Sequence, residues 1–130
     1  FDLSRLTCRN SHGDFTVHQI LCGDGNVNAV IDWTSACTHP AIWEITRSYF
    51  YGAPCTDGGV PGIEALPAYA EAYECHMPLL PYDRDHLLQL YLFQLAVCDY
   101  YSQYFHAEEN RKQEFLSQAR FATNVLKRYI

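Results

Sequence analysis

The stretch HGDFTVHQIL at residues 12–21, together with VIDW at residues 30–33, decides the fold of this chain. Each stretch carries one carboxylate, Asp14 in the first and Asp32 in the second. The residues between the two carboxylates form two short apolar runs around the turn sequence GDGN, whose residues tolerate positive φ angles. This pattern predicts a β-hairpin, with strands at residues 20–22 and 27–31. Because Asp14 precedes the first strand and Asp32 ends the hairpin, the two carboxylates can meet at one end of it.

From Pro40 onward the apolar residues have the spacing of helices. Residues 55–61 are rich in glycine and proline, which predicts a loop there. Pro67 either interrupts its helix or lies in the first turn of that helix. We expect helices at residues 41–51, 62–77, 83–106 and 108–129, and a loop at residues 55–61. The predicted fold class is therefore α+β and mostly α, with a small β-hairpin followed by about four helices.

Length and composition indicate one globular domain. The chain has 130 residues and 48% of them are hydrophobic, which is enough for a single core. Its formal net charge is −6, with 9 Lys and Arg against 15 Asp and Glu, so we do not expect nucleic acid as a partner. The sequence has neither a run of about 18 apolar residues nor the pattern of a signal peptide, so we expect no membrane span and a cytoplasmic location.

The six cysteines are widely spaced and form no CxxC motif. This spacing favours free thiols over a metal or redox site, because isolated cysteines in an intracellular protein are usually reduced. A disulfide framework remains the alternative interpretation.

The order of the polar residues around the hairpin indicates phosphoryl transfer. A loop carboxylate (Asp14), an amide five positions later (Gln19), a hairpin and a second carboxylate (Asp32) are the parts that a protein-kinase-type site uses. In such a site the loop aspartate accepts or orients the proton of the attacking hydroxyl. A side-chain oxygen and the second aspartate hold Mg²⁺ against the phosphates of the nucleotide.

These motifs resemble those of the aminoglycoside phosphotransferase and choline kinase-like families. The resemblance implies the C-terminal lobe of a protein-kinase-like fold, with Mg²⁺ and with ATP or GTP as the phosphate donor. The acceptor would be a hydroxyl of an aminoglycoside, choline, homoserine or sugar-like molecule. The resemblance makes Asp14 the catalytic base or hydroxyl-orienting residue, Asp32 the main Mg²⁺ ligand and Gln19 the second ligand. His12 would brace the catalytic loop.

Two positions extend or depart from the family pattern. Gln19 stands where the family usually has asparagine, and its extra methylene moves the amide oxygen by about 1.5 Å. Glu44 stands where the family commonly has an acidic residue in the helix after the metal loop. We expect Glu44 to fix the catalytic loop through hydrogen bonds rather than to touch the substrate.

The family needs an N-terminal lobe that covers the nucleotide, and the 13 residues before Asp14 carry neither a glycine-rich loop nor a strand lysine. We therefore expect residues 1–130 to be one domain, the C-terminal catalytic lobe, without the nucleotide lobe. Residues 1–39 would carry the catalytic loop and the metal-binding hairpin, and residues 40–130 the helical subdomain. Such a fragment would be nearly inactive alone, and its exposed lobe interface could form a homodimer.

Two other functions fit parts of the pattern. The chain could be a non-catalytic binding or scaffold protein that kept the kinase-like lobe, and the presence of Gln19 fits that view. It could instead be a metal-dependent hydrolase that uses His12, Asp14, His18 and Asp32, which predicts tight binding of a transition metal without nucleotide.

Overall fold

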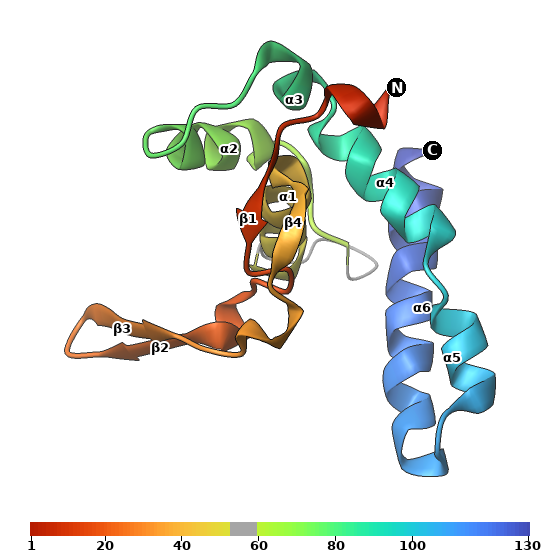
Figure 1. Cartoon of the computed structure of the whole chain (residues 1–130). Helices are drawn as coiled ribbons and strands as arrows, with labels where there is room; N and C mark the ends of the chain where they lie inside the picture. Colours follow the sequence, from red (N-terminus) through yellow and green to blue (C-terminus); the bar gives the residue numbers. More distant parts are fainter. Residues whose placement is uncertain (53–59) are drawn as a thin grey trace.

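The computed structural model describes residues 1–52 and 60–130, and most of these residues are helical. Figure 1 shows a two-stranded hairpin that projects from a body in which α1 lies between α2 on one side and α4 and α6 on the other. The strands are β1 (Cys8–Ser11), β2 (Ile20–Gly23), β3 (Asn26–Val30) and β4 (Cys37–Pro40). The α-helices are α1 (Ala41–Gly52), α2 (Leu66–Glu74), α3 (Pro81–Asp85), α4 (Leu87–Val97), α5 (Tyr100–His106) and α6 (Glu109–Tyr129). Short 3₁₀ helices lie at Leu3–Arg5, Val17–Gln19 and Trp33–Ser35.

The β-hairpin that the sequence predicts is present. Strands β2 and β3 pair in antiparallel fashion, with a bulge between Leu21 and Cys22. Two turn residues, Asp24 and Gly25, have φ angles of 52° and 78°, as the turn sequence requires. The backbone N–H of Ile31 donates to the carbonyl oxygen of Gln19 at 2.9 Å, which closes the end of the hairpin that lies nearest the helical body.

A second antiparallel pair, β1 with β4, was not predicted. Its register joins Cys8 to Pro40 and Ser11 to Cys37. The strand β4 leads directly into α1, and the N–H of Ala41 donates to the carbonyl oxygen of Thr7 at 2.9 Å. This pair therefore sets the start of α1 beside Thr7, the residue that precedes β1.

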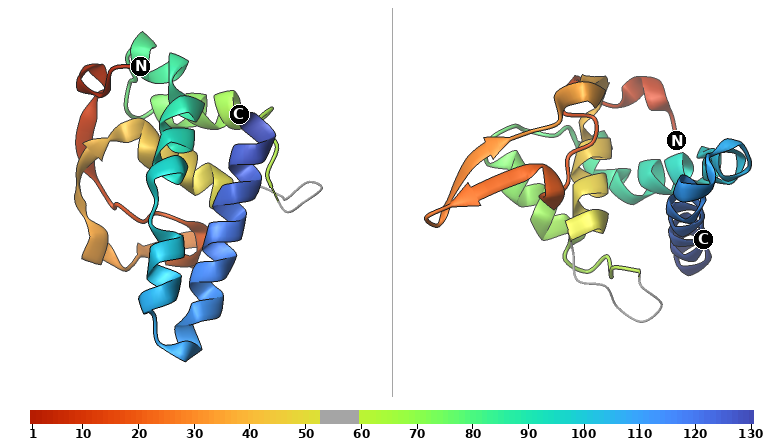
Figure 2. Two further views of the ribbon diagram at one scale, coloured as in Figure 1. Left: turned by 90° about the vertical axis from the view of Figure 1, so that its right-hand side faces the viewer. Right: turned by 90° about the horizontal axis from the view of Figure 1, so that it is seen from below.

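The core lies where α1 meets α4 and α6. Ile42, Leu90 and Val125 are fully buried there, and the ring of Phe50 stacks on that of Tyr91 with centroids 4.4 Å apart. The two views of Figure 2 show α4 close to α1 and α5 running beside α6. The helix predicted at residues 41–51 is confirmed as α1, and Ile42, Ile45 and Tyr49 on it are buried.

The prediction of one helix over residues 83–106 is wrong. The chain forms α3, α4 and α5 instead, with breaks at His86 and at Cys98–Asp99. Cys98 has extended backbone angles, φ −66° and ψ 149°, which turn the chain so that α5 packs along α6. Neither break carries glycine or proline, so tertiary packing has overridden a favourable helical propensity.

The other helices follow the sequence more closely. The helix expected at residues 62–77 is shorter, because α2 begins at Leu66 and Pro67 lies in its first turn, where proline removes no hydrogen bond. The last helix, α6, is confirmed, and Ala119 and Ala122 on it are buried. Most of the loop predicted at residues 55–61 lies outside the described residues.

Five cysteines have free thiols, and Cys55 lies outside the part of the chain that the structure describes. Within that part, no helix combines the length and the apolar character that crossing a membrane requires.

Candidate active site

Glu44, in the first turn of α1, holds the backbone of the loop on both sides of Asp14. Its Oε2 accepts a hydrogen bond from the N–H of Gly13 at 2.8 Å, and its Oε1 accepts one from the N–H of Phe15 at 2.9 Å. Bonds from backbone N–H groups to a carboxylate are stronger than bonds between neutral groups. One side chain of α1 therefore fixes the position of the residue that the sequence predicts as catalytic.

His12 joins the loop that carries Asp14 to the segment that carries Asp32. The imidazole is 5% exposed, and its Nε2 lies 2.7 Å from the carbonyl oxygen of Ile31. Its Nδ1 accepts from the N–H of Asp14 at 3.4 Å. These partners together assign the proton to Nε2. The ring also lies against Phe15 and Trp33, with centroids 5.8 and 4.8 Å away. The structure thus gives His12 contacts with both segments, and its effect on catalysis stays a prediction.

Asp32 is exposed and has the left-handed backbone conformation, with φ 62° and ψ 56°. This conformation is uncommon for any residue other than glycine, and it often marks a functional position. The Oδ1 of Asp32 accepts from the hydroxyl of Thr34 at 2.7 Å. Asp32 lies at the surface, where molecules from solvent can reach it.

Gln19 directs its side chain at Thr16 in this structure. Its Oε1 accepts hydrogen bonds from the N–H of Thr16, at 3.0 Å, and from the Thr16 hydroxyl. Thr16 is buried and in turn caps the short helix Val17–Gln19, because its hydroxyl oxygen accepts from the N–H of His18. The amide oxygen expected to bind metal is therefore engaged within the loop.

The carboxylate of Asp14 forms an ion pair with Arg47, a residue that the sequence analysis did not single out. The Nη2 of Arg47 contacts the Oδ1 of Asp14, and the guanidinium lies over the ring of Tyr51, 4.8 Å from its centroid. Arg47 follows Glu44 by three positions on α1, and residues at that spacing share a helix face. That spacing was the one signal in the sequence that could have identified Arg47.

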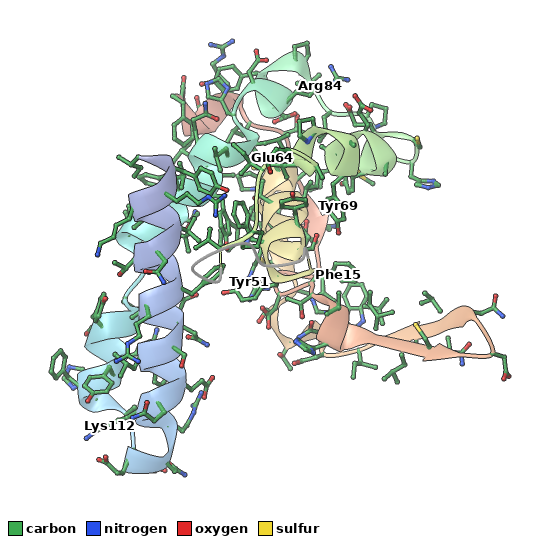
Figure 3. All side chains as sticks on the ribbon, turned by 180° about the vertical axis from the view of Figure 1, so that it is seen from behind. Phe15, Tyr51, Glu64, Tyr69, Arg84 and Lys112 are labelled. Atoms are coloured by element: carbon green, nitrogen blue, oxygen red, sulfur yellow. The ribbon has the colours of Figure 1, made fainter. Side chains whose placement is uncertain are left out.

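A pocket of about 330 Å³ lies between the loop, α1 and α2. Its walls are mostly apolar, and its one hydroxyl pair joins Ser48 to Tyr69 at 2.9 Å. Figure 3 shows Phe15 and Tyr69 on the same side of α1, and Tyr51 on the side that faces α6. The pocket is lined by Phe15, Glu44, Ile45, Ser48, Tyr69, Ala72 and Tyr73.

The cluster that a metal-dependent hydrolase would need is not found. Among residues 1–52 and 60–130, no three His, Cys, Asp or Glu side chains gather closely enough to hold a metal ion. His12 has partners at both ring nitrogens, and His18 is exposed. The arrangement offers no support for the hydrolase hypothesis.

The loop and the hairpin thus present one aspartate whose backbone is held by a helix carboxylate, and a second aspartate at the end of the hairpin. In a comparison with protein families, a model of a phosphotransferase enzyme family matches residues 7–87, more than half of the chain. The chain therefore belongs to this phosphotransferase family, which is the aminoglycoside phosphotransferase and kinase-like group that the motifs indicate. The searches of curated proteins and of solved structures gave no match.

Proposed function

We propose that this chain is the C-terminal lobe of a protein-kinase-like enzyme that moves the terminal phosphate of ATP or GTP to a hydroxyl of a small molecule. A phosphotransferase activity in general follows from the family. The observation that supports the more specific proposal is the bracing of Asp14, since Glu44 binds the backbone on both sides of it. A loop aspartate held in this way suits the alignment of an acceptor hydroxyl, and alignment supplies a large share of the rate in phosphoryl transfer.

Asp14 would accept or orient the proton of the acceptor hydroxyl. Its side chain is 37% exposed, so a small molecule can reach it from solvent. Glu44 and His12 would keep the loop in place through the hydrogen bonds described above and would not touch the substrate. Candidate acceptors are aminoglycosides, choline, homoserine and sugar-like molecules.

Asp32 and Gln19 are the proposed ligands of Mg²⁺. The exposed carboxylate of Asp32 fits this role, because Mg²⁺ prefers oxygen ligands and keeps several of its own waters. Gln19 fits only if its amide oxygen leaves Thr16, to which it is hydrogen bonded. When bound, the metal would neutralise charge on the nucleotide phosphates.

The face that carries the hairpin is the proposed site for the nucleotide and an N-terminal lobe. Several apolar side chains in and beside the hairpin are exposed, and such a group is unusual on a surface that no other domain or chain covers. They are Val17, Leu21, Val27, Ile31 and Trp33, with exposed fractions between 41% and 64%. A homodimer through the same face is the other possible occupant. We also propose a cytoplasmic location, where ATP and GTP are available as donors.

The test is phosphoryl transfer by the full-length gene product, with ATP and GTP, against a panel of amino sugars, amino alcohols and sugars. We expect turnover with at least one acceptor, and its loss in Asp14→Ala. Asp85→Ala is the matched control, because Asp85 is exposed on α3 and should leave turnover unchanged. A folded protein that neither binds nor consumes nucleotide would reject the proposal.

A non-catalytic binding or scaffold protein is the second candidate. It is favoured by the engagement of Gln19 within the protein, because the amide oxygen expected to bind metal is hydrogen bonded to Thr16. The two candidate functions differ in one prediction: the enzyme should bind nucleotide more tightly when Mg²⁺ is present, and the scaffold should not. Calorimetric titration of ATP with and without Mg²⁺ separates them, since a scaffold would show no metal-dependent binding.

A further inference from the structure

The side chain of Arg47 is mostly buried, which is unusual for an arginine. Its side chain is only 17% exposed, and one of its two terminal nitrogens contacts Asp14. The other, Nη1, is buried and makes no hydrogen bond within residues 1–52 and 60–130. A buried charged group normally has its partners satisfied. The guanidinium is thus held against Asp14 although this position leaves part of its hydrogen-bonding capacity unused.

The surrounding charges make Arg47 the natural partner of this carboxylate. No lysine or arginine occurs between Arg9 and Arg47, which is the segment that carries both aspartates of the site. Arg9 is directed elsewhere, because its guanidinium donates to the carbonyl oxygen of Pro78 at 3.1 Å. Arg47 therefore supplies the fixed positive charge at Asp14.

The packing around Arg47 limits its movement. The guanidinium lies over the ring of Tyr51, one turn further along α1, and that ring packs against Phe121 of α6 with centroids 5.5 Å apart. Figure 3 shows Tyr51 at the side of α1 that faces α6. A planar guanidinium stacked on an aromatic ring has few alternative orientations. The direction of the Asp14 side chain is consequently linked to the packing of α1 against α6.

We infer that Arg47 is the positioning residue for Asp14 in the proposed transfer reaction. Glu44 fixes the backbone of the loop, and Arg47 fixes the carboxylate itself by binding Oδ1. The oxygen that remains, Oδ2, is then the one that receives the hydrogen bond of the acceptor hydroxyl. Glu44 and Arg47, three positions apart on α1, thus together position Asp14. This inference rests on the proposed function, and its test separates the two.

The experiment measures kcat and KM for Arg47→Gln and Arg47→Lys in the full-length gene product, with the acceptor found in the panel. We expect kcat to fall about 100-fold in Arg47→Gln, since misplacement of a catalytic group by about 1 Å costs roughly that factor. The KM values for nucleotide and acceptor should stay within about threefold. Arg47→Lys should recover part of kcat, because it keeps the charge and loses only the planar geometry.

The matched control is Arg84→Gln, which makes the same change in an ion pair with Glu74, 2.6 Å long and remote from the loop. Its kcat should equal that of the unmodified protein. Thermal unfolding of every variant shows whether a loss of rate is a loss of folded protein.

A double-mutant cycle with Asp14→Asn gives the decisive result. If Arg47 acts through Asp14, Arg47→Gln should lower the residual rate of Asp14→Asn by less than about threefold. A full 100-fold loss in that background, or an unchanged kcat in the single variant, would overturn the inference while leaving the proposed function intact. Absence of turnover in the unmodified protein would reject the proposed function and the inference with it.

Discussion

Gly13 and Ser35 touch through their backbones, and this contact joins the loop of Asp14 to the segment that follows Asp32. A Cβ atom added to Gly13 would lie 2.0 Å from the carbonyl oxygen of Ser35, closer than any real Cβ contact. Gly13 also has φ +83°, a conformation that L-residues with side chains rarely adopt. Both the space and the backbone angle therefore require glycine in the middle of the HGD motif.

We expect Gly13→Ala to destabilise the protein by about 3 kcal/mol or more. The left-handed conformation alone costs an alanine about 1 kcal/mol, and relief of the clash with Ser35 requires the backbone to move. Urea unfolding measures the change. Gly25→Ala is the control, because Gly25 has φ +78° with no atom within 4 Å of the added Cβ, and it should cost only about 1 kcal/mol. Equal losses in the two variants would show that the Ser35 contact has no energetic effect.

The fold was predictable where the information is local. The β2–β3 hairpin follows from its turn residues, and α1 and α6 follow from their apolar spacing. The β1–β4 pair was not predictable, because it joins residues about thirty positions apart and its side chains are largely exposed. The break at Cys98 was missed for a related reason. It depends on the packing of α5 along α6, which local propensity does not contain.

In the candidate site, too, some features could be predicted from local sequence and others depend on tertiary packing. The order of Asp14, Gln19 and Asp32 could be interpreted from their spacing, Glu44 could be identified from the resemblance to the family, and the roles of all four stay predictions. The contact of Arg47 with Asp14 depends on the face that α1 turns to the loop. The rotation of α1 is set by Ile42 and Ile45, which are buried against the other elements of the core.

We expect Glu44→Gln to loosen the loop while leaving the overall fold intact. The amide offers one acceptor oxygen in place of two, so the N–H of Gly13 or that of Phe15 loses its partner. The loss should be about 1–2 kcal/mol. Hydrogen exchange of these two amides should become faster, while Glu71→Gln, at an exposed position of α2, should leave their exchange unchanged. Unaltered exchange in Glu44→Gln would contradict the bracing role.

Tyr91→Phe should make the protein more stable, by about 1 kcal/mol. The hydroxyl of Tyr91 is buried and has no hydrogen-bond partner in the described part of the chain, and burial raises its pKa far above the usual range. An unpaired buried hydroxyl is destabilising, and phenylalanine keeps the stacking on Phe50. Thermal unfolding should show a higher Tm. Tyr129→Phe should lower it, because that hydroxyl donates to the carbonyl oxygen of Pro61 at 2.7 Å.

The stability of the protein should fall between pH 10 and pH 12, in part because of Tyr100. Burial, with further contributions that include its neighbour Tyr51, raises the pKa of Tyr100 from 10.0 to about 12. In that window the unfolded chain loses the phenolic proton and the folded protein keeps it, so unfolding is favoured as the pH rises. Below pH 10 both states are protonated and the full stability is present. Urea unfolding from pH 8 to pH 12 should give a smaller decline in Tyr100→Phe, and an identical decline would contradict the assignment.

Asp83→Asn should cost about 3 kcal/mol, although it changes a single atom of the side chain. Asp83 is fully buried, and its two oxygens accept hydrogen bonds from backbone N–H groups far apart in sequence, Thr7 at 2.8 Å and Leu80 at 3.0 Å. Asparagine keeps one acceptor and sets an amide N–H₂ against the other donor, which leaves buried donors unpaired. Urea unfolding measures the loss, and Asp85→Asn, exposed on the same helix, should change stability by less than about 0.5 kcal/mol. If both variants are equally stable, the carboxylate of Asp83 does not anchor Thr7, the residue before β1, to α3.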